Sequence, residues 1–81
     1  MSVTRLTQPP RELAYRTGDG IEVTLYWRPD TDELSVCVCD HRRGAYFVVR
    51  PEQHLALDVF YHPYSYVSAS EVHYEDERLA A

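Results

Sequence analysis

The segment "IEVTLYWR", residues 21–28, constrains the fold most strongly because its apolar and polar side chains alternate without a break. Successive side chains of a β-strand point to opposite faces, so this period of two predicts a half-buried strand. One face carries Ile21, Val23, Leu25 and Trp27, and the other carries Glu22, Thr24, Tyr26 and Arg28.

The residues before this strand predict a hairpin. Residues 18–20 are Gly, Asp and Gly, which tolerate positive φ and are expected to form the turn that joins "ELAYRT" to the strand. One register then satisfies both the charges and the apolar pattern. Its expected pairs are Arg16 with Glu22, Tyr15 with Val23, and Leu13 with Leu25.

Two further turns extend the hairpin into a meander. Residues 29–32 begin with Pro and contain two Asp, and residues 41–44, "HRRG", end in the Gly that a hairpin loop favours. The pairs expected across the first turn are Arg28 with Glu33, Trp27 with Leu34, Leu25 with Val36, and Val23 with Val38. Those expected across the second are Val38 with Phe47 and Val36 with Val49.

These registers predict an α+β fold built on a four-stranded antiparallel β-meander, with strands at residues 12–17, 21–28, 33–40 and 45–50. The apolar face of such a sheet needs a second layer to bury it. Its expected members are Leu13, Tyr15, Ile21, Val23, Leu25, Trp27, Leu34, Val36, Val38, Phe47 and Val49.

One helix is expected to supply that layer. "RPEQHLALDVFYHP" places Pro51 at a favoured first helical position and ends before Pro63. An apolar stripe at helical spacing is expected to lie on the sheet. It consists of Leu55, Ala56, Val59 and Phe60.

The domain organisation follows from these elements. We expect a partly flexible N-terminal arm at residues 1–11, a ββββα domain at 12–67, and an acidic C-terminal tail at 68–81 that either frays or forms a short helix from about Ser70. A chain of 81 residues holds one modest core, which favours a binding module or a subunit over an enzyme.

Composition narrows the class of partner. The formal net charge is −5, and no basic stripe is visible beyond Arg42 and Arg43, so nucleic-acid binding is not expected. The apolar runs are too short to span a bilayer, and "MSVTRLTQPPRE" lacks the apolar core of a signal peptide. We therefore expect a cytoplasmic protein that neither enters a membrane nor binds nucleic acid.

Two side-chain groups could hold a metal ion, although neither makes a complete site. Cys37 and Cys39 are two apart in a strand and share one face, but structural zinc sites need four ligands, and only His41 lies nearby in sequence. His54, Asp58 and His62 recur every four residues along the expected helix. The simpler interpretation makes the first group a pair of small strand residues and the second a solvent-facing polar stripe, so no metal or cofactor is expected.

The outer face of the sheet is the main functional indication. By the registers above, Tyr26, Cys37, Cys39, Tyr46 and Val48 lie there among Thr24, Ser35, Glu22 and Arg50. Most one-sided antiparallel sheets carry more charge on this face, and a contiguous apolar patch usually contacts another chain. The alternative is that the C-terminal segment with Tyr64, Tyr66 and Val67 folds back over the face.

Three segments, "DGIEVTLYW", "TDELSV" and "LDVFYHPYSYV", together resemble a group of small uncharacterised actinobacterial proteins of about 80 residues. The resemblance spans most of residues 12–67 and implies a bacterial cytoplasmic setting, but it implies no activity. We therefore expect a non-enzymatic protein-interaction module or regulatory subunit that self-associates through the outer sheet face, with a homodimer or another protein as partner. The alternative is a small metal- or ligand-binding protein that uses the helix His/Asp row or the two cysteines.

Overall fold

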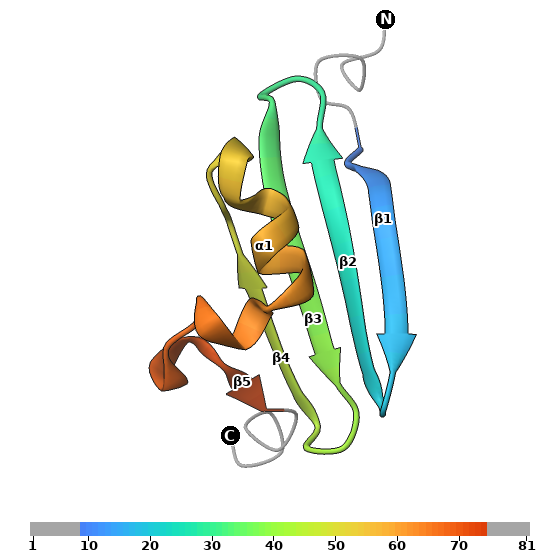
Figure 1. Cartoon of the computed structure of the whole chain (residues 1–81), viewed down its shortest axis with the longest axis vertical. Coiled ribbons are helices and arrows are strands. Elements are labelled where there is room, and N and C mark those ends of the chain that lie inside the picture. The colour runs from blue at the N-terminus through green and yellow to red at the C-terminus, as the bar shows by residue number, and fades with distance from the viewer. Residues whose placement is uncertain (1–8, 75–81) are drawn as a thin grey trace, which may run out of the picture.

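A computed structural model of the chain describes residues 9–74. Its main element is an antiparallel sheet in the order β1-β2-β3-β4-β5 (Figure 1). The strands are β1 (Arg11–Gly18), β2 (Ile21–Arg28), β3 (Glu33–Asp40), β4 (Ala45–Val49) and β5 (His73–Tyr74). The α+β class and the antiparallel meander are confirmed, but the sheet has five strands instead of the four expected. The fifth lies in the segment that was expected to be a tail or a short helix.

The central registers agree with the sequence. In β2 and β3, Val23 lies opposite Val38 and Leu25 lies opposite Val36, and in β3 and β4, Val38 lies opposite Phe47. Every pair predicted across the turns at residues 29–32 and 41–44 is present.

The register of β1 differs from the expected one by one residue. The turn that precedes β2 holds two residues, Asp19 and Gly20, with φ of 54° and 79°, so Gly18 pairs with Ile21. Positive φ at both central positions is typical of the two-residue hairpin turn that matches strand twist. Arg16 therefore lies opposite Val23, and the predicted pairing of Arg16 with Glu22 is wrong.

A one-residue shift exchanges the two faces of a strand, so the expected places of Leu13 and Tyr15 in the core are also wrong. Their side chains are 53% and 49% exposed. Ala14 packs against the core instead, opposite Leu25, and a bulge between Glu12 and Ala14 accommodates the extra residue.

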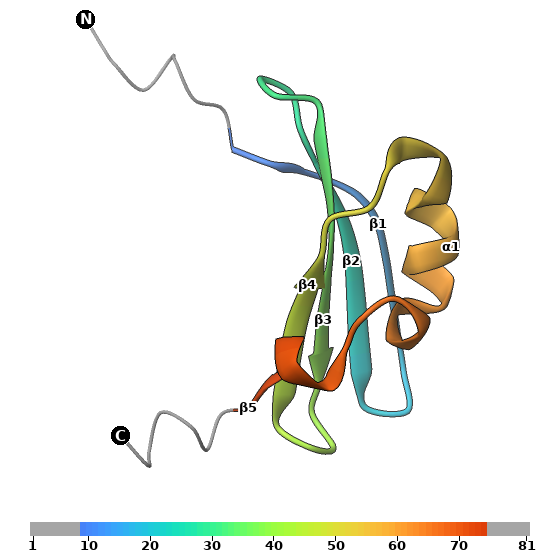
Figure 2. The same ribbon diagram turned by 90° about the vertical axis from the view of Figure 1, so that its left-hand side faces the viewer.

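A short helical layer covers one face of the sheet, as Figure 2 shows in side view. Its elements are the 3-10 turn η2 (Gln53–Leu55), the helix α1 (Ala56–Tyr61) and the 3-10 turn η3 (Pro63–Ser65). The 3-10 turn η4 (Ala69–Glu71) follows and lies beyond the β4 edge of the sheet (Figure 1). The expected helical start at Pro51 is wrong because Glu52 is extended, with φ −69° and ψ 153°. The apolar stripe is confirmed: Ala56, Val59 and Phe60 are buried in the core, and Leu55 packs against it.

The core lies between α1 and the central strands. Its most completely buried apolar side chains, each exposed by 1% or less, are Val23, Val36, Val38, Phe47 and Val59. Three of the five come from β2 and β3, the strands whose registers follow directly from the alternation in the sequence.

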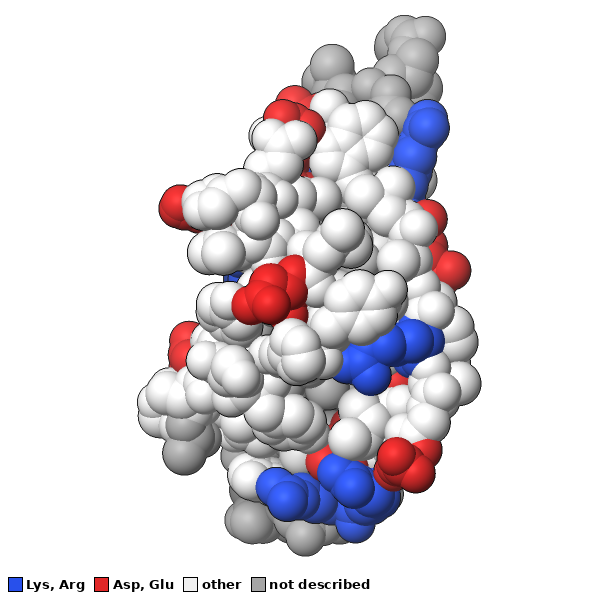
Figure 3. Space-filling view, viewed as in Figure 1, with Lys and Arg blue, Asp and Glu red and all other residues white. Residues whose placement is uncertain are grey.

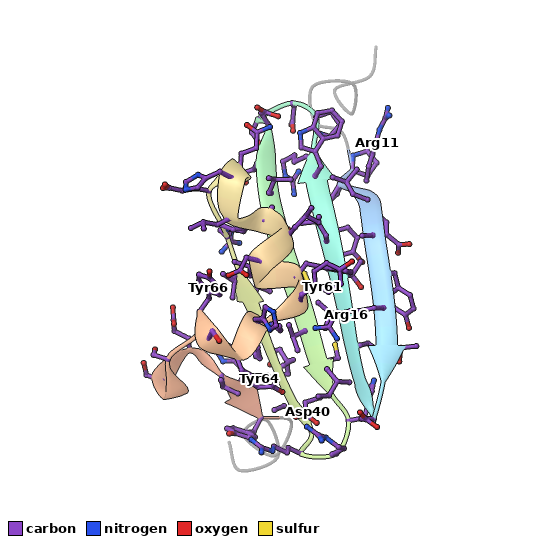
Figure 4. The ribbon with its side chains drawn as sticks, viewed as in Figure 1. Arg11, Arg16, Asp40, Tyr61, Tyr64 and Tyr66 are labelled. Atoms are coloured by element: carbon purple, nitrogen blue, oxygen red, sulfur yellow. The ribbon has the colours of Figure 1, made fainter. Side chains whose placement is uncertain are left out.

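Arg16 ties β1 to the end of the helix (Figure 4). Its Nε and Nη2 donate to the carbonyl of Phe60 at 3.0 and 2.9 Å, and Nη2 also donates to the carbonyl of Tyr61 at 3.2 Å. The guanidinium carbon also lies 5.6 Å from the centroid of the Phe60 ring and 5.9 Å from that of the Tyr61 ring. A cation at this position complements the unpaired carbonyls and partial negative charge of the helix C-terminus.

Two glycines of the first hairpin provide a matched test of this register. A Cβ on Gly20 would lie 2.8 Å from Cγ of Arg42 at a φ of +79°, whereas a Cβ on Gly18 would meet nothing within 4 Å. We expect Gly20→Ala to lower the free energy of unfolding by about 1–2 kcal/mol, and Gly18→Ala to change it by less than about 1 kcal/mol. Urea denaturation of both variants measures the difference, and equal effects would contradict the two-residue turn.

Candidate interaction surface

The face of the sheet opposite α1 carries no covering layer within residues 9–74 (Figure 2). Cross-strand neighbours arrange its side chains in rows. One row runs Tyr15, Thr24, Cys37, Val48, and the next runs Thr17, Glu22, Cys39, Tyr46, His73. A third contains Glu12, Tyr26 and Ser35. We call this surface the outer face.

The five residues predicted as an interaction surface all belong to these rows. Val48 is 45% exposed and Cys39 is exposed, whereas Tyr26, Cys37 and Tyr46 are half-buried by their neighbours on the same face. The strand registers therefore bring all five together on one side of the sheet.

Sequence reasoning missed part of this surface. The shifted register of β1 adds the exposed side chain of Tyr15 to the outer face, opposite Thr24, while Leu13, which is also exposed, lies at the bulge. His73 of β5 extends it at the opposite edge, where its ring stacks on Tyr46 with centroids 5.3 Å apart. The sequence signal that could have predicted the register of β1 is the pair Asp19–Gly20, because Asp-Gly favours a two-residue hairpin turn.

Glu22 brings a negative charge to the outer face near the β1–β2 turn, and its carboxylate forms contacts there. Oε1 accepts a hydrogen bond from the hydroxyl of Tyr15 at 3.2 Å, and Oε2 lies 2.7 Å from Nε2 of His41. The partners come from the neighbouring strand and from the β3–β4 turn. The carboxylate is thus held by local contacts within the chain.

Cys37 and Cys39 carry free thiols. Burial, and to a lesser extent the proximity of Cys39, raises the pKa of the Cys37 thiol. The positive charge of nearby Arg50 acts in the opposite direction. A raised thiol pKa keeps the sulfur protonated near neutral pH, which disfavours nucleophilic reactivity. In the single chain, Cys37 therefore behaves as a small, weakly polar side chain.

The segment that contains Tyr64, Tyr66 and Val67 lies on the helix-covered side of the sheet and not on the outer face. The ring of Tyr64 packs edge-on against Phe47 at 5.2 Å, Val67 packs against the core, and the hydroxyl of Tyr66 donates to Asp58. The alternative in which Tyr64, Tyr66 and Val67 cover the outer face is therefore wrong.

The structure does not assemble the predicted His/Asp row on one helix. His54 lies in η2, Asp58 lies in α1, and His62 leaves the helix with φ −135° and ψ 56°. Among residues 9–74 there is no group of three or more His, Cys, Asp or Glu placed to hold a metal ion. The row thus gives the metal-binding alternative no support.

A buried carboxylate, Asp40, lies at the end of β3 on the helix-covered side of the sheet and is 1% exposed. It accepts hydrogen bonds from the backbone N–H of Arg42 at 3.0 Å, the Arg42 guanidinium at 3.2 and 3.3 Å, and the Tyr64 hydroxyl at 2.7 Å. Arg43 lies 3.9 Å away. Figure 3 shows arginines gathered at this end of the molecule, and Figure 4 shows Tyr64 beside Asp40.

The hydrogen bonds from Arg42, supported by the one from Tyr64, hold the pKa of the Asp40 carboxyl well below its usual range, and they outweigh the opposing effect of burial. Because its donors are side chains and backbone of the chain itself, we interpret this cluster as a structural link between the β3–β4 turn and η3.

No protein-family model matches the chain, nor does any curated protein or any solved structure. Within residues 9–74, no helix combines the length and the apolar character needed to cross a membrane.

The Asp40 cluster predicts a defined pH dependence. Asp40→Asn should lower the free energy of unfolding at pH 7 by about 1–3 kcal/mol, because a charged acceptor of several hydrogen bonds is lost. The folded-state pKa is lower than the unfolded value of about 3.9, so this contribution is complete above that pH and is lost as the pH falls below it.

The difference between the wild type and Asp40→Asn should therefore narrow below about pH 4. Urea denaturation at a series of pH values measures it, with Asp30→Asn in the exposed β2–β3 turn as the control. A difference that stays constant down to acidic pH would contradict the charged interaction.

Proposed function

We propose that the chain is a small, non-enzymatic protein-interaction module that associates with a second copy of itself through the outer face. The observation that carries the proposal is the open sheet surface with exposed apolar side chains at Tyr15 and Val48. Exposed apolar surface that is contiguous over several strands usually marks a contact with another protein.

The size of the outer face is compatible with a modest interface. Strands β1 to β3 have eight residues each. At about 3.3 Å per residue and about 4.8 Å between strands, four strands present roughly 500 Å² of flat surface. Two such faces together give roughly 1,000 Å², near the lower limit for a specific complex. Side-chain relief increases the area that would be buried.

The charges on the face favour a second copy as the partner. Glu22 lies near the β1–β2 turn end of the face, and Arg50 follows β4 at the other end, close enough to Cys37 to oppose the rise in the pKa of its thiol. A two-fold axis in the plane of the sheet can set Arg50 of each copy near Glu22 of the other. Such pairing gives orientation to an otherwise apolar contact.

Engagement of the titratable groups supports the non-enzymatic part of the proposal. The carboxylates of Glu22 and Asp40 are held by hydrogen bonds within the chain, and Nε2 of His41 is directed to Glu22. These groups are committed to local contacts rather than arranged around a substrate-sized cavity.

Two variants, each with one arginine introduced on a different side of the molecule, test the interface. Val48→Arg places an arginine on the outer face and should weaken self-association at least about tenfold, since burial of an unpaired charge costs more than about 1.4 kcal/mol. Leu57→Arg is the matched control, because Leu57 is 61% exposed on α1, away from the outer face.

Sedimentation equilibrium of the wild type and both variants measures the association, and circular dichroism checks that each is folded. A wild type that remains monomeric at all concentrations, or equal weakening by both variants, would contradict the proposal.

A further inference from the structure

The two thiols of the outer face form an incomplete ligand set. Cys37 and Cys39 both point to this face from β3, because two residues separate equivalent positions of a strand. Structural zinc sites have four ligands, and four thiolates are a common set. One chain supplies only two here, since no third His, Cys, Asp or Glu in residues 9–74 completes a group with them.

His41, the candidate ligand nearest in sequence, contacts another side chain. Its Nε2 lies 2.7 Å from the Glu22 carboxylate, and its side chain is 57% exposed. A three-ligand site of two thiols and His41 is therefore not assembled within one chain. Completion of the site requires donors from outside the chain.

The position of the thiols shows where such donors would come from. β3 is the middle strand of the sheet, with β2 and β4 on either side. Cys37 lies between Thr24 and Val48, and Cys39 lies between Glu22 and Tyr46. A two-fold contact centred on β3 places the two thiols of one copy opposite the same two thiols of its partner.

We propose that two copies of the chain, packed through their outer faces, share one tetrahedral zinc site made of Cys37 and Cys39 from each copy. The inference rests on the proposed function and specifies what stabilises the contact at its centre. Thiolates are soft ligands and select zinc over magnesium or calcium.

The geometry accommodates this site when the two β3 strands cross near 90°, as in orthogonally packed sheets, because opposite edges of a tetrahedron are perpendicular. Same-face positions of a strand are about 6.6 Å apart, and packed sheets lie about 10 Å apart, which leaves space for short side chains and an ion between them. Zn–S bonds of about 2.3 Å place sulfurs of one tetrahedron about 3.8 Å apart. The two sulfurs of each chain thus lean toward each other by about 3 Å in total, which a change of χ1 rotamer provides.

The proton balance predicts a pH dependence. Zn–S bonds form to thiolates, so the thiol protons are released to solvent as the ion binds, and no oxidation or reduction occurs. The apparent affinity for zinc should therefore rise with pH through the neutral range.

The experiment uses the full chain, reduced, freed of metal with a chelator and then titrated with zinc sulfate. Light scattering follows the mass, and cobalt(II) in parallel reports tetrahedral thiolate ligation by its visible absorption. We expect saturation at one ion per two chains, with dimerisation strengthened at least tenfold. The double variant Cys37→Val, Cys39→Val keeps the face apolar and should lose the ion, the cobalt absorption and the added association.

The alternative outcomes separate the two proposals. A dimer that forms without metal and takes up none would overturn the shared site while leaving the proposed function in place. One ion per chain on a monomer would overturn both. Cobalt absorption that is unchanged in the double variant would assign the metal to other ligands and also overturn the shared site.

Discussion

The turn at Asp19 and Gly20 decides which side chains of β1 face the helix and which face outward. With two residues at positive φ it pairs Gly18 with Ile21, and this register places Ala14 and Arg16 on the helix side. A longer turn would exchange the two sets, since a slip of one residue inverts a strand. Both faces of the sheet therefore depend on this turn.

On the covered side, the register gives Arg16 access to the end of α1. A helix of six residues has few internal hydrogen bonds, so its stability comes largely from packing and from groups that satisfy its ends. Arg16 does so at the C-terminus, while Val59 and Phe60 bury the apolar side. On the open side, the same shift places Tyr15 on the outer face and enlarges it.

The sequence predicts those parts of the fold that are set by local periodicity. The alternation of β2, continued through residues 34–39 of β3, predicted the register of these strands and the outward positions of Tyr26, Cys37 and Cys39. The turn at residues 41–44 then predicted those of Tyr46 and Val48. In β1, "LAY" is apolar at consecutive positions, so either face could be assigned to the core and only turn geometry decided.

Other features depend on contacts between distant segments. Asp40 is satisfied partly by Tyr64, 24 positions away, and β5 is a strand of two residues that pairs with the start of β4. No local pattern encodes either contact. The late start of α1 reflects the extended conformation of Glu52, which the favourable position of Pro51 did not reveal.

In the proposed dimer, a second copy covers the outer face. The most direct measurement is the rate at which iodoacetamide alkylates Cys39, followed by mass spectrometry over a range of protein concentrations with chelator present. Cys39 is exposed in the single chain, so we expect slow alkylation at high protein concentration and faster alkylation on dilution. A rate that does not depend on protein concentration would contradict it.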